Sequence, residues 1–184
     1  MELIGPYLAA CVLLIAAGVA KALRPAGTAR AVAGRLPLAL PLVRGAVRTG
    51  AALEAAVGAT ALLRPGPTTA GLVAASYLLF ALYVAAVSSR GGPLSSCGCF
   101  GTPDTPATPL HAVVDLFLAG SSALVAATVA SGTLPGLLSG QPWRGVPLVL
   151  LSLLCAWLLA MTLGSLARLG AARRRLGITR GTAG

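Results

Sequence analysis

Five long apolar stretches divide this chain, and they constrain its fold more than any other feature of the sequence. Each stretch has the roughly 20 residues that a helix needs to cross the hydrocarbon core of a bilayer. Because a chain in hydrocarbon must satisfy its own backbone hydrogen bonds, we expect each stretch to be a helix. The stretches cover approximately residues 4–22, 43–63, 68–88, 108–130 and 146–166.

Composition supports a membrane protein with little room for anything else. Charged residues make up only 10% of the chain, against about 25% in soluble domains. We therefore predict an all-α fold: one polytopic transmembrane bundle of about five helices, a four-helix core plus one. We expect residues 1–170 to form this domain and residues 171–184 to form a basic tail. Residues 28–40 could form a short helix in the headgroup region.

The net charge of +10 comes mainly from arginines at the ends of the apolar stretches. This placement is typical of membrane flanks attracted to anionic headgroups and excludes a nucleic-acid groove, which would interleave cations with aromatic residues. If five helices cross the membrane in alternating directions, only Arg64 and Arg144 lie on one side of it. Lys21 and all the remaining arginines lie on the opposite side. The positive-inside rule makes the crowded side cytoplasmic. We expect a multi-pass protein of the inner (plasma) membrane, with its N-terminus outside and its tail in the cytoplasm.

The first stretch is expected to be a retained helix. A cleaved signal peptide carries its positive charge before the apolar segment, whereas here Glu2 precedes it and Lys21 and Arg24 follow it.

The most reactive segment is the sequence Cys-Gly-Cys-Phe-Gly at residues 97–101, between the third and fourth stretches. Gly98 supplies the backbone freedom that a bond between Cys97 and Cys99 needs, but so small a ring is strained and easily reduced. The charge pattern puts this loop on the cytoplasmic face, where a permanent disulfide would not persist. A transient redox pair is favoured, or a site at which both thiolates bind zinc or copper(I).

Ionisable residues also occur inside the apolar stretches. At about 1.5 Å per residue, Glu54 lies ~16 Å from the side of the cysteine loop, near the middle of the bilayer. A carboxylate there costs roughly 2.5–3.5 kcal/mol, so Glu54 should face the bundle and either be protonated or find a partner. A structural hydrogen bond to a neighbouring helix is the alternative. His111 and Asp115 are four residues apart and share one face of the fourth stretch, with Asp115 ~10 Å deep.

The cysteine loop, His111, Asp115 and Glu54 are expected to lie at increasing depth, from one membrane surface toward the middle of the bilayer. Tyr83 could join this series. Forming a disulfide releases two protons and two electrons, which such groups could accept and pass on. The candidate catalytic residues are therefore Cys97, Cys99, Glu54, His111 and Asp115. As an alternative, Cys97, Cys99, His111 and Asp115 could form a metal site.

Three segments resemble the methylamine utilisation protein MauE family, within the DoxX-like group of small membrane proteins. They are Ala-Ala-Gly-Val-Ala-Lys at residues 16–21, Ala-Leu-Glu-Ala at residues 52–55, and the cysteine segment at residues 97–101. The resemblance implies a role in methylamine metabolism: helping to mature the disulfide-rich small subunit of periplasmic methylamine dehydrogenase, alongside a thioredoxin-like protein. It also implies that Cys97 and Cys99 are the functional pair and that Lys21 and Glu54 match helix positions of the family.

The leading functional hypothesis is a membrane thiol-disulfide oxidoreductase that passes electrons between a thioredoxin-like partner and the membrane. The sequence does not identify the electron acceptor; quinone is one candidate, by analogy with other membrane thiol oxidases. Two alternatives remain: a non-enzymatic scaffold or assembly factor whose loop only docks a partner, and a metal-binding membrane protein.

Overall fold

The computed structural model describes residues 4–34, 38–89 and 109–128, together with residues 147, 149–159, 161, 162, 165 and 169. In these residues every regular element is helical, which confirms the all-α prediction. The helices are α1 (Ile4–Leu23), α2 (Ala26–Ala33), α3 (Leu40–Leu63), α4 (Pro67–Ser89) and α5 (Pro109–Thr128), followed by an apolar helix at Val149–Leu159.

Helices α1, α3, α4 and α5 are long and apolar enough to cross a membrane. They coincide with the first four predicted spans. The fifth predicted span, residues 146–166, contains the helix Val149–Leu159, which is shorter than a full crossing in its described part. A multi-pass helical bundle is therefore the architecture of this chain.

The predicted boundaries differ from the structure mainly before α3. Pro41 precedes the second predicted stretch, residues 43–63, but in the structure it occupies the first turn of α3, where a missing N–H costs no helical hydrogen bond. The short interfacial helix predicted over residues 28–40 is α2, which instead ends at Ala33 and is capped by Gly34. With 8 residues and a length of ~12 Å, α2 cannot span a bilayer.

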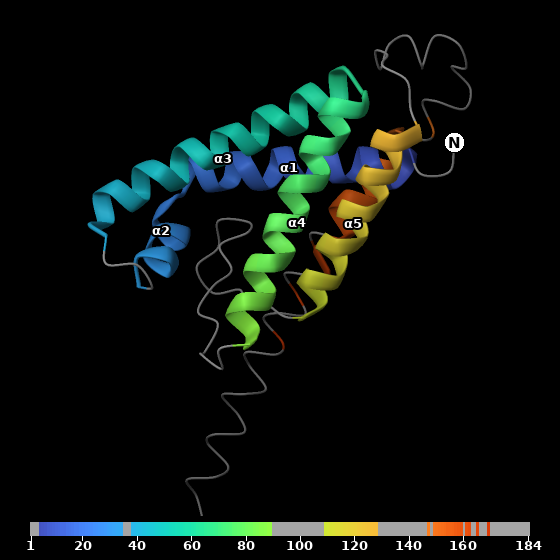
Figure 1. The fold of residues 1–184 in the computed structure, drawn as a ribbon. Coiled ribbons are helices and arrows are strands. Elements are labelled where there is room, and N and C mark those ends of the chain that lie inside the picture. Colours follow the sequence, from blue (N-terminus) through green and yellow to red (C-terminus); the bar gives the residue numbers. More distant parts are fainter. Residues whose placement is uncertain are drawn as a thin grey trace, which may run out of the picture.

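The four long helices of the bundle form two pairs (Figure 1). Helices α1 and α3 lie side by side, as do α4 and α5, and α4 crosses the first pair. Helices α3 and α4 diverge from the short turn at residues 64–66. Half of the α1 span is buried inside the protein, against 17% of the α3 span. Helix α1 is thus the central element of the bundle.

Small residues let α1 and α3 approach closely. A Cβ atom added at Gly18 would lie 2.7 Å from both the Ala51 carbonyl oxygen and the Ala55 backbone nitrogen. One added at Gly58 would lie 2.9 Å from the Cys11 carbonyl oxygen. In lipid, where helices gain little from hydrophobic association, such backbone contact supplies van der Waals packing.

Two buried tyrosines tie the central helix to its neighbours. The Tyr7 hydroxyl donates a hydrogen bond to the Ala61 carbonyl oxygen of α3 at 3.1 Å. The Tyr77 hydroxyl of α4 donates to the Ala10 carbonyl oxygen of α1 at 2.7 Å. A buried phenol needs such a partner because no water is available to it. These bonds fix the register of α3 and α4 against α1.

We expect Gly18→Ala to destabilise the bundle, because the new methyl group would collide with the α3 backbone. Overpacking of this kind costs about 1–3 kcal/mol. Gly50→Ala is the matched control, since a Cβ atom there meets nothing within 4 Å and alanine favours a helix over glycine. Thermal unfolding in detergent, followed by circular dichroism, measures the difference. Equal midpoints for the two variants would show that the α1–α3 contact is not tight.

Candidate functional site

An ion pair inside the bundle joins the two central helices. The Lys21 ammonium group of α1 pairs with the Glu54 carboxylate of α3. Their side chains are only 10% and 22% exposed. The expectation that Glu54 faces the bundle and finds a partner is confirmed. The partner neutralises a charge that would otherwise be costly at this depth.

Helix α4 adds an aromatic face to this pair. The Lys21 nitrogen lies 4.6 Å from the centroid of the Phe80 ring, within the range of a cation–π interaction. Tyr77 packs edge-on against Phe80, with ring centroids 5.9 Å apart and planes at 87°. The ammonium group is therefore held by a carboxylate from α3 and an aromatic ring from α4.

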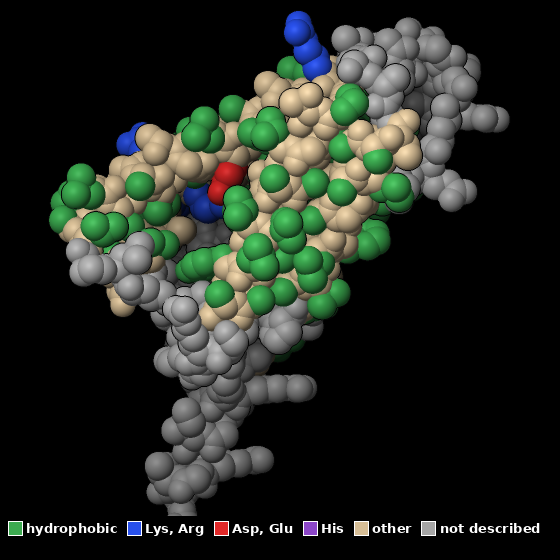
Figure 2. All heavy atoms as spheres, viewed as in Figure 1, with side chains coloured by type: hydrophobic (Ala, Val, Ile, Leu, Met, Phe, Trp, Pro, Cys, Tyr) green, Lys and Arg blue, Asp and Glu red, His purple; other side chains and the backbone are tan. Residues whose placement is uncertain are grey.

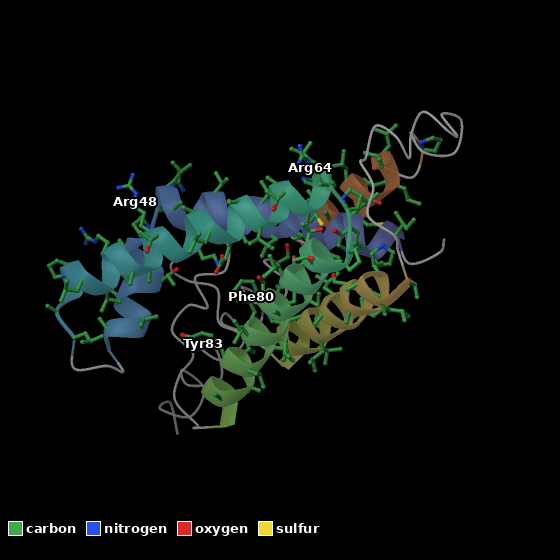
Figure 3. All side chains as sticks on the ribbon, turned by 45° about the horizontal axis from the view of Figure 1, so that its top comes forward. Arg48, Arg64, Phe80 and Tyr83 are labelled. Carbon is green, nitrogen blue, oxygen red and sulfur yellow. The ribbon has the colours of Figure 1, made fainter. Side chains whose placement is uncertain are left out.

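The ion pair borders a hollow between the two helix pairs. Figure 2 shows acidic and basic side chains meeting in this hollow, between α3 and α4. Phe80 and Tyr83 extend from the same side of α4 (Figure 3), and Tyr83 is 39% exposed. Tyr83 thus lies about one turn after Phe80, on the same side of α4. The sequence suggests that Tyr83 could join the titratable groups, and this position is on the side of α4 from which Phe80 reaches Lys21.

Helix α5 contributes the second carboxylate. Asp115 is partly buried and interacts electrostatically with Lys21 and Tyr77. Among the described residues the direct ion pair of Lys21 is with Glu54, so Asp115 acts at longer range. His111, one turn before Asp115, is buried. The structure therefore brings Glu54 and Asp115, predicted from two separate stretches, around one lysine.

The two loop cysteines lie outside the described residues, so their geometry relative to His111 and Asp115 stays a prediction. The described residues hold no group of three or more His, Cys, Asp or Glu side chains that could bind a metal ion. The predicted metal site needs both Cys97 and Cys99, and it is therefore untested.

Lys21 is the residue whose role the charge pattern missed. It was counted as a cytoplasmic flank cation, but it is 8% exposed and faces α3. Its position three residues after Gly18, on the face that contacts α3, is the signal that could have revealed this. The family resemblance implies that Lys21 matches a helix position of the family, but it does not identify Glu54 as the ion-pair partner of Lys21.

This arrangement defines a polytopic α-helical membrane protein with a charged cluster inside its bundle. The family described as "Methylamine utilisation protein MauE" matches residues 3–131, a range that runs from α1 through α5 and includes the cysteine loop. The chain belongs to this family, as the sequence resemblance indicated. No curated protein and no solved structure matches it.

We expect Lys21→Met or Glu54→Gln alone to lower stability by about 3–5 kcal/mol, because each removes one partner of a direct, buried ion pair. The double variant removes both charges and should recover most of the loss. A double-mutant cycle on thermal unfolding in detergent measures this coupling. Arg64→Met, at an exposed site on the same chain, is the control and should change little. If the double variant loses the sum of the two single losses, the pair is not coupled.

Proposed function

We propose that this chain is a membrane thiol-disulfide redox protein that helps to mature a partner protein through Cys97 and Cys99. The observation that carries the proposal is the cluster of Lys21, Glu54 and Asp115. Asp115 lies on α5, which begins at Pro109, just after the connection that holds both cysteines. Titratable groups are thus available inside the bundle, one of them on the helix that follows the cysteine segment in sequence.

The reaction proposed is thiol-disulfide exchange with a thioredoxin-like dithiol. One partner thiolate attacks the Cys97–Cys99 bond and forms a mixed disulfide, and the second partner thiol then resolves it. The partner leaves as a disulfide, and this chain holds the dithiol. Reoxidation passes two electrons and two protons to a membrane quinone, which becomes a quinol. Glu54, His111 and Asp115 are the groups proposed to take up and pass on the protons.

The proposed site of action is the cytoplasmic face of the plasma membrane. Arg24, Arg30, Arg44 and Arg48 are exposed near the end of α1 and the start of α3, whereas Arg64 is exposed at the other end of α3. Figure 3 shows Arg48 and Arg64 toward opposite ends of that helix. This bias favours a cytoplasmic position for the first group. Residues 1–170 would then form the membrane domain, and the basic tail at residues 171–184 would follow in the cytoplasm.

We expect Cys97 and Cys99 to form a bond that opens and closes reversibly. Differential alkylation of the purified protein, read by mass spectrometry, should find two fewer reactive thiols after oxidation and should recover them after reduction. Cys97→Ser or Cys99→Ser should abolish the change. Cys11→Ser and Cys155→Ser are the controls, since Cys11 is buried and Cys155 is an exposed free thiol on another helix.

The same assay separates the alternatives. If Cys97 and Cys99 never form a disulfide and the purified protein contains stoichiometric zinc or copper, the result favours a metal site over redox exchange. A double cysteine variant without any loss of client maturation would leave a scaffold role.

For the proton-transfer groups, Glu54→Gln and Asp115→Asn should slow quinone-dependent reoxidation by about 10²-fold, whereas Arg64→Gln should not.

The orientation makes a separate prediction. In a variant that keeps only Cys97 and Cys99, a membrane-impermeant maleimide should label inside-out vesicles and spare right-side-out vesicles. Labelling only from the outside would reverse the topology. Such a reversal would place the redox pair beside a periplasmic client.

A further inference from the structure

A recess lies at the corner where the chain turns from α1 through α2 into α3. It has a volume of about 310 Å³ and lies beside the start of α3, against which α2 packs (Figure 1). Because α2 is too short to span a bilayer, this corner is expected at the membrane surface. The recess is lined by Pro25, Leu40, Pro41, Arg44, Gly45 and Arg48.

One wall of the recess is cationic. Arg44 and Arg48 stand one helical turn apart, and both are exposed. Figure 3 shows Arg48 extending from the side of α3 that faces away from α4. The carboxylates of the described residues are elsewhere: Glu54 pairs with Lys21 inside the bundle, and Asp115 lies on α5. The two arginines are therefore available to an anion from outside the protein.

The other wall is apolar. Pro25, Leu40 and Pro41 present hydrocarbon to the recess, and Leu42 on the same first turns of α3 is 69% exposed. A free phosphate ion would match the arginines but would gain nothing from this wall. A phosphate attached to a glycerol and acyl chains would match both walls, since basic pockets beside membrane helices bind anionic headgroups.

We propose that this recess binds the headgroup phosphate of an anionic phospholipid. Arg44 and Arg48 bind the phosphate oxygens, and the apolar wall contacts the glycerol and the first acyl carbons. The site is independent of the redox function proposed above, because the recess shares no residue with the cluster of Lys21, Glu54 and Asp115.

Gly45 permits a steric test that leaves the charge unchanged. A Cβ atom added there meets nothing within 4 Å. Because Gly45 lines the recess, we expect a larger side chain at this position to reduce the space left for a ligand. Gly50 has the same open surroundings on the same helix but does not line the recess. Leucine favours a helix over glycine, so both variants should fold.

The experiment titrates the purified full chain in detergent with phosphatidylglycerol, phosphatidylcholine or inorganic phosphate, and counts bound ligand by native mass spectrometry. We expect phosphatidylglycerol to bind in preference to the other two. Arg44→Gln combined with Arg48→Gln should weaken this binding about 25-fold, because each arginine near an anionic surface contributes roughly fivefold. Gly45→Leu should weaken it by tenfold or more. Arg64→Gln and Gly50→Leu should leave it unchanged.

Several results would overturn the proposal. Equal binding of phosphatidylcholine would show that the phosphate charge is not recognised. Equal affinity for inorganic phosphate would make the recess a simple anion site. Full binding by Gly45→Leu, with loss only in the arginine variant, would show diffuse attraction outside the recess. Loss in the Arg64→Gln and Gly50→Leu controls would mean that net charge or general stability, and not this corner, governs lipid binding.

Discussion

The pairing of Lys21 with Glu54 is the interaction on which the centre of this bundle depends. It is made possible by a glycine. Gly18 lies one turn before Lys21, and its missing side chain lets the α3 backbone at Ala51 and Ala55 come close. Glu54 sits between these two alanines and therefore reaches α1. The close backbone contact at Gly18 brings α1 and α3 together, and the ion pair neutralises the two charges that this contact buries.

The Lys21–Glu54 pair also connects the α1–α3 pair of helices to the α4–α5 pair. Helices α4 and α5 approach α1 at a steep angle (Figure 1), and their contribution to the pair is an aromatic ring and a more distant carboxylate. Phe80 covers the ammonium group, while Asp115 interacts with it electrostatically. One lysine therefore serves two acids from different helices. A site of this kind has a carboxylate in excess of its cation, which is the chemical condition for holding and releasing a proton inside a membrane.

The sequence predicts the spans well because the ~20-residue length of a crossing is a strong physical constraint. It also predicts that Glu54 must have a partner, since an isolated carboxylate at that depth is costly. It does not identify the partner, because Lys21 at the end of an apolar stretch has the same appearance as a flank cation. Only the α1–α3 contact at Gly18 distinguishes the two cases. Pro41 is a similar case: proline signals both the end of a loop and the first turn of a helix.

The central position of α1 has a consequence for the biosynthesis of the chain. Helix α1 leaves the ribosome before α3, yet its lysine is neutralised by a residue of α3 that is made 33 positions later (Lys21 to Glu54). Until then the ammonium group must be accommodated alone. Lys21 lies two residues before the end of α1 at Leu23, so its long side chain can reach the aqueous boundary during insertion. The arrival of α3 would then draw the cation inward, so that folding of this bundle includes the late burial of a charge that entered the membrane at its edge.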